Sequence, residues 1–345
     1  PYRFHLELTD KCKAGCPMCS RTDPANFCKA NDKVQKLDLT LADFERHFTQ
    51  EFCARTEHIE LGGGLGDPLA ARDCLEICDH LTRYGVNLVV STNGGLRNTQ
   101  WWEKLGHILQ RTDSVVQLHV DGLKDTNPLY RVNTDFDKIV ANAQAYLATG
   151  APAEWYYILF RHNEHQVEEA RDLSRRIGFR NFVLIDTIRF GKRDSFPYRL
   201  PNGEWHALEP ATLTSADFEK KFQQEASSSK SQGASLPSPL DPIAAKAAAG
   251  VNGIRCKSQI HNRPYINCEG FVSPCCWMAT SPEEVFVYEQ AGLDMANYNI
   301  RNRLLSDILH DEPFASLYER DWETGNNPIC NRKCRDMVRN TRAAV

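Results

Sequence analysis

Six apolar, strand-like runs recur through the first part of this sequence, and they constrain the fold more than any other feature. They occupy residues 3–9, 58–63, 87–93, 115–121, 155–160 and 181–187. The segments between them are amphipathic, with apolar residues at spacings of three and four, at residues 39–54, 71–85, 135–150 and 164–179. Strands that alternate with helices favour a parallel sheet with helices outside it. We therefore expect an α/β fold with its functional residues on the loops that follow the strands.

The regular alternation ends near residue 190, and the rest of the chain has a different character. Residues 192–210 are irregular and polar. Residues 225–242 are rich in Ser, Pro and Gly, which is typical of a flexible linker or a surface loop. A second cysteine-bearing region begins at Cys256. The predicted organisation is a core domain over residues 1–200, a connector over residues 201–250 and a small domain over residues 251–345.

The composition is that of an ordinary globular protein, with 41% hydrophobic and 25% charged residues among 345. The net charge of −4 gives no general electrostatic footprint for long nucleic acid or an anionic membrane. No apolar run approaches the roughly 18–20 residues that a membrane helix needs. We therefore expect a cytoplasmic protein that acts on neither a membrane nor long nucleic acid.

The thirteen cysteines cluster instead of spreading along the chain. They gather at positions 12, 16 and 19, and again at 256, 268, 275 and 276 with 330 and 334. A chain of this length does not need disulfides to hold its core, and the count is odd. Short spacers between clustered cysteines favour metal binding in a reducing compartment over disulfides.

Cys12, Cys16 and Cys19 lie in the loop that follows the first predicted strand. Two thiols make a disulfide and four close a zinc site, whereas three leave one coordination position open. Thiolates are the natural ligands of iron–sulfur irons, so these three can hold three irons of a [4Fe–4S] cube. The alternatives are a zinc loop with a distant fourth ligand, and buried structural thiols.

The Cys-x3-Cys-x2-Cys spacing resembles that of the radical S-adenosylmethionine (radical SAM) superfamily. The resemblance implies a partial parallel (β/α)6 barrel and a [4Fe–4S] cluster whose open iron binds the amino and carboxylate groups of S-adenosylmethionine (SAM). It further implies that an electron donor such as flavodoxin or ferredoxin reduces the cluster. A 5′-deoxyadenosyl radical would then take a hydrogen atom from a substrate.

Further segments fall where that family places its SAM contacts. The stretch 62–69, GGGLGDPL, resembles the family's Gly-Gly-Glu-Pro segment, with Asp67 where Glu is usual. The resemblance implies SAM contacts from Met18, Gly64, Gly66, Asp67, Ser91, Asn93, Asp121 and Arg131. Arg131 is expected to pair with the SAM carboxylate, and Met18 to pack on the adenine. The alternatives are a glycine-rich surface turn at 62–69 and a surface ion pair for Arg131.

The second cysteine region resembles the auxiliary-cluster half of the family's SPASM and twitch domains. Its pattern is Cys256-x13-Gly270-x4-Cys275. The shorter twitch form, with a single auxiliary [4Fe–4S] cluster, fits the number of cysteines better. The implied ligands are Cys256, Cys275, Cys330 and Cys334, with Cys276 as the rival of Cys275.

Three other residues are candidates for catalysis: Cys28, just past the first cysteine motif, and His162 and His165, which follow the fifth strand. A structural role is the competing interpretation for Cys28. For the histidines it is a helix N-terminus capped by Asn163. Cys74 and Cys78, one helical turn apart, are expected in the core, as is the Trp101–Trp102 pair.

The resemblance therefore predicts a radical SAM enzyme that acts on a small molecule, a nucleoside or a peptide. No peptide-recognition domain is visible in the sequence, which slightly favours the first two classes. A fully ligated second cluster would accept an electron, and this favours a net oxidation. The alternatives are a redox-neutral epimerase or isomerase, in which a thiol such as Cys28 returns a hydrogen atom, a purely structural second cluster, and a non-catalytic iron–sulfur protein for electron transfer or redox sensing.

Overall fold

The computed structural model describes residues 1–228, 258, 263–279, 288–289, 292–314 and 329–330. The strands are β1 Tyr2–Leu6, β2 Thr22–Asp23, β3 Lys29–Ala30, β4 Thr56–Leu61, β5 Asn87–Thr92, β6 Val115–His119, β7 Ala153–Leu159, β8 Asn181–Asp186, β9 Phe196–Arg199, β10 Trp205–Leu208, β11 Tyr265–Ile266 and β12 Val272–Ser273. The α-helices are α1 Leu41–His47, α2 Gln50–Ala54, α3 Cys74–Arg83, α4 Thr99–Leu109, α5 Asn127–Tyr130, α6 Phe136–Leu147, α7 Val167–Ile177, α8 Ser215–Ser228, α10 Cys276–Ala279 and α12 Leu305–Leu309. Short 3₁₀ turns span η1 Pro68–Ala70, η2 Glu164–Gln166 and η5 Met295–Tyr298.

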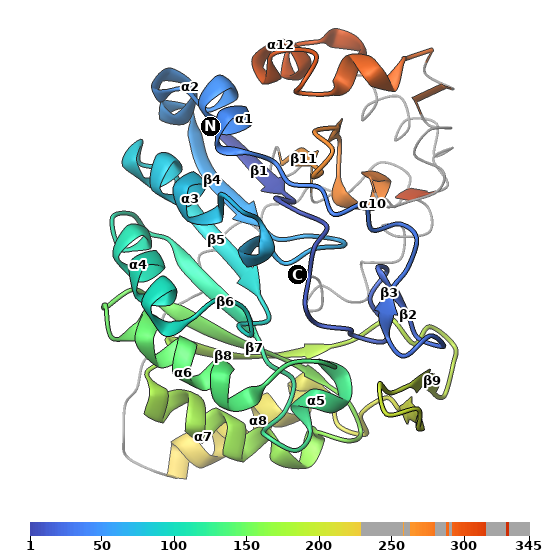
Figure 1. Ribbon diagram of the computed structural model, residues 1–345. Coiled ribbons are helices and arrows are strands. Elements are labelled where there is room, and N and C mark those ends of the chain that lie inside the picture. The colour runs from blue at the N-terminus through green and yellow to red at the C-terminus, as the bar shows by residue number, and fades with distance from the viewer. Residues whose placement is uncertain (229–257, 259–262, 280–287, 290–291, 315–328, 331–345) are drawn as a thin grey trace.

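The main sheet confirms the predicted α/β fold. Its order is β12-β11-β1-β4-β5-β6-β7-β8, and the six predicted strands pair in parallel from β1 to β8 in chain order. Helices α3, α4, α6 and α7 lie along its outer side (Figure 1). All six carboxyl ends therefore point to the same edge, where the first cysteine motif follows β1.

Successive side chains of a strand point to opposite faces of the sheet, so the apolar ones gather on one face, and the helices cover that face. Phe4 and Leu6 of β1 and Ile59 and Leu61 of β4 are at most 1% exposed and belong to the core that the helices complete. The helices start where the sequence offers caps. Thr40, for example, forms a capping box at the start of α1. This packing fixes the sheet that positions the loops.

The predicted helices are confirmed, with some differences in extent. The segment 39–54 is divided into α1 and α2, which are separated by the two cap residues Phe48 and Thr49. The Trp101–Trp102 pair lies on α4, where Trp102 is fully buried and its indole N–H donates to the Leu96 carbonyl at 3.0 Å. The expected packing role of Trp102 is therefore correct.

Residues 192–210 are not irregular, as their polar composition predicted. They form the antiparallel hairpin β9–β10, in which Tyr198 is buried. Its turn contains Asn202 and Gly203, a pair that is typical of hairpin turns and that the composition argument overlooked. The start of the predicted linker is also different, because residues 225–228 belong to α8. Its remainder lies outside the described residues.

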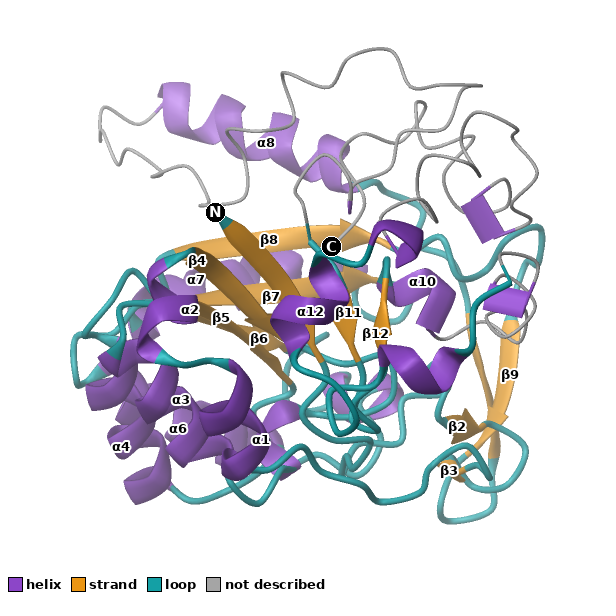
Figure 2. Ribbon diagram, turned by 90° about the horizontal axis from the view of Figure 1, so that it is seen from above, coloured by secondary structure: helices purple, strands orange, loops and turns teal. Residues whose placement is uncertain are grey.

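A short hairpin from the second cysteine region extends the main sheet. β11 pairs in parallel with β1, and β12 pairs antiparallel with β11 (Figure 2). The turn between them contains Gly270 at φ +92°, and a Cβ there would lie 2.8 Å from the Asn299 side-chain oxygen. This position therefore requires glycine.

Candidate active site at the carboxyl ends of the strands

The cysteine loop is fixed by hydrogen bonds at both ends. Asp10 is 2% exposed, and its carboxylate accepts from the backbone N–H groups of Gln35, Lys36 and Leu37 at 2.5, 2.9 and 2.8 Å. The Cys19 N–H donates to the Cys16 carbonyl at 3.0 Å. The loop therefore presents its thiols from a rigid backbone.

Two of the three sulfurs have donors from other strand ends. Asn93, after β5, directs its side-chain N–H toward Cys12 Sγ at 3.6 Å. Arg131, after β6, directs a guanidinium N–H toward Cys16 Sγ at 3.6 Å. Burial raises the pKa of both thiols. N–H donors and a nearby cation oppose that effect, because they stabilise negative charge on sulfur.

The donor set fits an iron–sulfur cluster. The three thiols come from one short loop, and all pack against the same small apolar cluster around Phe160. In the described part of the chain, no three His, Cys, Asp or Glu side chains approach closely enough to share a single metal ion. Ligands of a [4Fe–4S] cube do not need that proximity, since each thiolate binds a different iron. Cys12, Cys16 and Cys19 are thus the residues that would hold it.

Asp67 lies at the centre of this arrangement with its carboxylate buried. The carboxylate accepts from the Asn93 backbone and side-chain N–H groups at 3.0 and 2.5 Å, and from the Thr92 hydroxyl at 2.9 and 3.0 Å. Its other partner is the Leu69 N–H. Burial raises the pKa of Asp67, and these donors oppose the rise. Asp67 therefore orients Asn93 toward Cys12, and a direct contact with SAM stays a prediction.

Asp121 and Arg131 form a buried ion pair and not the surface pair that was the alternative. Arg131 Nε donates to Asp121 Oδ2 at 2.5 Å, and the two side chains are 14% and 0% exposed. The other Asp121 oxygen accepts from the Ile158 N–H at 2.6 Å. Asp121 therefore holds the guanidinium that reaches Cys16. The contact of Arg131 with the SAM carboxylate stays a prediction.

The glycine-rich segment passes close to the cysteine loop. The Gly64 carbonyl accepts from the Ser20 hydroxyl at 2.8 Å. A Cβ on Gly66 would lie 1.6 Å from the Thr9 carbonyl oxygen, so no larger residue fits there. The Leu65 and Gly66 N–H groups donate to Glu7, which sequence reasoning missed. Glu7 was visible as an acid in the apolar run 3–9.

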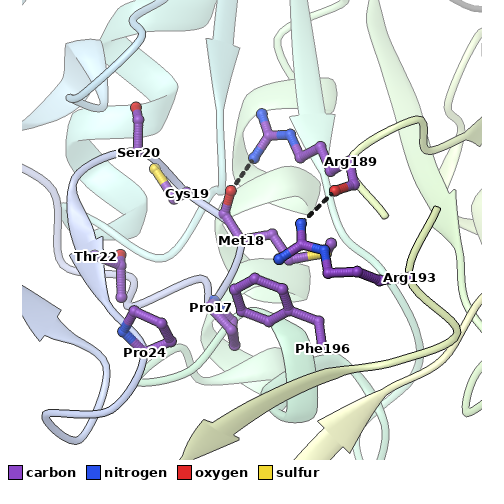
Figure 3. A pocket seen from close by; sticks show the side chains of 9 residues that line it. All are labelled: Pro17, Met18, Cys19, Ser20, Thr22, Pro24, Arg189, Arg193 and Phe196. Atoms are coloured by element: carbon purple, nitrogen blue, oxygen red, sulfur yellow. Dashed lines mark hydrogen bonds between the residues drawn. The ribbon is translucent and has the colours of Figure 1, made fainter. Parts of the chain in front are cut away.

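Met18 borders a cavity of about 200 Å³ beside the cysteine loop. Figure 3 shows Cys19 and Arg189 on its walls, with Phe196 on another side. Arg189 follows β8, and its guanidinium donates to the Met18 carbonyl at 2.9 Å. Met18 therefore lies where the end of the sixth parallel strand meets the cysteine motif.

Ser91 belongs to a polar face of the sheet, opposite the helix-covered one. Its hydroxyl donates to Gln117 at 3.1 Å, and Gln117 donates to the Tyr156 hydroxyl at 2.9 Å. His119 faces the same way, with its ring 5.2 Å from that of Tyr156. Burial lowers the pKa of His119 to about 3. Sequence reasoning missed His119, although its spacing of two from Gln117 and Asp121 places the three on one face.

Cys28 lies next to the cysteine loop but is 2% exposed. Its thiol donates to the Arg199 carbonyl at 3.5 Å. Burial, with a smaller contribution from Cys16, raises the pKa of the Cys28 thiol to about 11. The structure thus brings Cys28 close to the motif and packs it in the apolar cluster with Cys16 and Phe160.

The two histidine candidates lie differently. His162 stacks on Phe160 at 5.4 Å, and burial lowers its pKa to about 4. His165 is exposed on the η2 turn. Asn163 does not cap the helix with its side chain. Instead it donates to the carbonyls of Asp121 and Ile158 at 3.0 and 2.9 Å, which ties the ends of β6 and β7 together.

The auxiliary-cluster candidates are only partly described. Cys275 and Cys276 follow β12, and Cys276 begins α10. Burial raises the pKa of the Cys276 thiol to about 11. Cys330 is described and partly buried, whereas Cys256 and Cys334 lie outside the described residues. Their ligand roles stay predictions. The core roles of Cys74 and Cys78 are correct, because both are fully buried on α3.

None of the helices in the described ranges combines the length and apolar character that crossing a membrane requires.

Comparisons with known proteins agree with this geometry. Residues 6–174 match the family model described as the Radical SAM superfamily. The crystal structure of Streptococcus suis SuiB is similar over 91% of this chain and 66% of its own, with a TM-score of 0.54 and 14% identity. Native anSMEcpe with bound AdoMet is similar over 97% of this chain and 89% of its own, with a TM-score of 0.58 and 13% identity. At such identities the similarity shows a shared fold.

Two related structures of these proteins also contain peptides. SuiB has been solved bound to the precursor peptide SuiA, and native anSMEcpe with AdoMet and the Cp18Cys peptide. The chain spans about two thirds of the length of SuiB. Residues 6–174, on a parallel sheet whose first loop carries the three cysteines, therefore form a domain of the radical SAM superfamily.

Proposed function

We propose that this protein is an enzyme that cleaves SAM reductively at a [4Fe–4S] cluster and abstracts a hydrogen atom from a substrate. The observation that carries the proposal is that residues from the chain after β5 and after β6 both reach the cysteine loop that follows β1. Asn93 reaches Cys12, and Arg131 reaches Cys16. Thiolates bound to zinc would accept the same donors, so we prefer iron to zinc because residues 6–174 match the radical SAM family model.

The residues around the motif have distinct roles in this proposal. When bound, the cluster supplies the electron that splits the SAM sulfonium, and the resulting radical takes the hydrogen atom. The segment 62–67 binds the amino-acid end of SAM through its backbone. Arg131 faces the SAM carboxylate, and Asp121 holds the guanidinium in place. Met18 and the cavity beside Arg189 take the adenine.

The substrate lies against the polar face of the sheet in this proposal, where His119 and Tyr156 are side by side. Small molecules, nucleosides and peptides all remain candidate classes. The peptide class gains support from SuiB and anSMEcpe, since both have structures with bound peptides. An imidazole held neutral by burial can accept a hydrogen bond from any of them.

The net reaction is an oxidation in this proposal, with Cys256, Cys275, Cys330 and Cys334 holding a second cluster that accepts the electron. The redox-neutral alternative needs a thiol that returns a hydrogen atom. Cys28 is poorly suited to that task, because its sulfur is buried and donates to the Arg199 carbonyl. A flavodoxin or ferredoxin is the proposed electron donor, and the cytoplasm the proposed location.

The test is anaerobic incubation of the iron-loaded protein with dithionite and SAM, followed by chromatography and mass spectrometry. We expect 5′-deoxyadenosine and methionine. A cluster that dithionite reduces without any SAM cleavage would contradict the proposal and favour an electron-transfer or redox-sensing protein. Zinc in place of iron in anaerobically purified protein would contradict it as well.

A further inference from the structure

Glu7 is a buried acid with three neutral hydrogen-bond donors. It follows β1 and is 2% exposed. One carboxylate oxygen accepts from the backbone N–H groups of Leu65 and Gly66 at 2.6 and 2.9 Å. The other accepts from the Tyr265 hydroxyl at 2.6 Å. Because both oxygens are engaged, the carboxylate has one favoured orientation.

The glycine-rich segment lies directly on this carboxylate. A Cβ on Gly63 would lie 2.5 Å from Glu7 Oε1, so the backbone approaches as closely as glycine permits. The flanks of the segment are held by other contacts. The Gly62 carbonyl accepts from His5 at 3.1 Å, and the Asp67 N–H donates to the Lys11 carbonyl at 2.9 Å. Glu7 thus holds the middle of a segment whose ends are already fixed.

Tyr265 brings the second cysteine region into the same contact. It lies on β11, fully buried, in register with His5 of β1, and the two rings meet edge to face at 4.9 Å. The chain continues from β11 through the turn to β12 and Cys275. A single carboxylate therefore connects the glycine-rich segment to the C-terminal hairpin, whose Tyr265 is 258 residues from Glu7 in sequence.

We propose that Glu7 is a positioning residue for SAM binding, and that Tyr265 of the C-terminal hairpin completes it. Glu7 holds segment 62–67 in the shape that binds the amino-acid end of SAM, and Tyr265 fixes the orientation of Glu7. This inference rests on the proposed function, which assigns SAM to that segment. It goes further, because it makes SAM affinity depend on a residue outside the radical SAM domain.

The physical reason is the cost of an unpaired buried oxygen. Without the Tyr265 hydroxyl, one Glu7 oxygen loses the donor that it has among the described residues, and burial then raises the pKa of Glu7 further than it already does. A carboxylate without that partner rotates or takes up a proton. In either case its hold on the Leu65 and Gly66 N–H groups weakens, and the segment loses its binding shape.

The test compares Tyr265→Phe, Glu7→Ala and Glu7→Gln with the unchanged protein, all with reconstituted clusters. Equilibrium SAM binding, iron content and thermal unfolding are measured. We expect Tyr265→Phe to bind SAM about tenfold more weakly, and Glu7→Ala at least as weakly, at unchanged iron content. Glu7→Gln keeps an oxygen for the two N–H groups and an amide that can donate to Tyr265, so we expect an affinity within about threefold of wild type.

Tyr288→Phe is the matched control. Tyr288 is also buried in the C-terminal region, and its hydroxyl donates to the Val272 carbonyl of β12 at 2.9 Å, away from Glu7. It should lose stability comparably to Tyr265→Phe but keep its SAM affinity. Wild-type SAM affinity in Tyr265→Phe, or equal losses in both tyrosine variants, would overturn the inference. So would a Glu7→Gln variant as weak as Glu7→Ala. A wild-type protein that binds no SAM would instead contradict the proposed function.

Discussion

The two cysteine regions are attached to the same sheet in different ways. In the first, the cysteine sulfurs themselves receive donors from Asn93 and Arg131, which follow other strands. In the second, two residues that lie between Cys256 and Cys275 contact acids of β4 and of the chain directly after β1. Tyr265 contacts Glu7, and Arg263 pairs with Glu60. The cysteine motif directly after β1 is therefore contacted by residues that follow neighbouring strands. The hairpin β11–β12 comes much later in the chain and is attached to the sheet by pairing with β1.

The largest expected effect tests the first cysteine region of this comparison. Replacing Cys12, Cys16 and Cys19 with Ala should remove one cluster's worth of iron and abolish SAM cleavage while the fold survives. The matched control is Cys74→Ala with Cys78→Ala, because these thiols are buried in α3 and have no proposed metal. Iron analysis and 5′-deoxyadenosine formation check the result. A triple variant that cleaves SAM at the wild-type rate would show that the first region does not hold the cluster.

The second half of the comparison is tested by removing Cys330 and Cys334. We expect the loss of a second cluster's worth of iron and a persistent, detectable cleavage of SAM. Product should no longer form once a substrate is known, because the proposed electron acceptor is missing. Cys275→Ala and Cys276→Ala, examined singly, should differ in iron content, with the larger loss in Cys275→Ala. Iron content that none of these changes lowers would rule out an auxiliary cluster on these ligands.

The Asp121–Arg131 ion pair beside the first cysteine region allows the comparison to be tested through protein stability. Arg131→Ala leaves the fully buried Asp121 without its cation, and removing one partner of a buried pair costs about 3–5 kcal/mol. The double change Arg131→Ala with Asp121→Asn should regain part of that loss, because no buried charge is then unpaired. Urea unfolding of the cluster-free protein measures both. A loss below about 1 kcal/mol in the single variant is incompatible with the buried pair.

Replacing Asp67 should have a smaller effect, which is limited to the binding of SAM. Asp67→Ala frees Asn93, whose side chain then no longer points reliably at Cys12. We expect SAM binding weaker by roughly 1.5–3 kcal/mol, with iron content unchanged. Asn93→Ala should reproduce most of that loss if Asp67 acts by orienting Asn93. Should Asp67→Ala lose affinity while Asn93→Ala keeps it, a direct contact between Asp67 and SAM is the better explanation.

The sequence predicted what local patterns determine. Hydrophobic periodicity located the six strands that pair in parallel from β1 to β8, and the cysteine loop was expected at the edge where they end, because parallel strands must end at one edge. The patterns could not show which partners meet across that edge. Glu7, Asn163 and the link from Asp67 to Asn93 depend on contacts between distant segments. The hairpin β9–β10 was missed for another reason, since its polar composition concealed the Asn202–Gly203 turn.

The effect that should be smallest at neutral pH concerns the polar face of the sheet, to which the second region contributes Arg263 through Glu60. Burial lowers the pKa of His119 to about 3, and the charges that also act on it are Arg131, Glu60 and Arg189. An unfolded chain protonates this imidazole near pH 6.5, so between pH 6.5 and about 3 the unfolded state binds the extra proton. The free energy of unfolding must therefore fall as the pH falls through that window.

A single histidine gives a slope of up to about 1.4 kcal/mol per pH unit there, and His119→Gln should remove it. His107→Gln on α4 is the control, since His107 is exposed. Urea unfolding of the cluster-free proteins at several pH values between 4 and 7 compares the three slopes. Parallel curves for wild type and His119→Gln would mean that the imidazole takes up its proton at the same pH in the folded and the unfolded protein. In that event His119 could also accept a proton near neutral pH, and would not be limited to the hydrogen-bond acceptance proposed above.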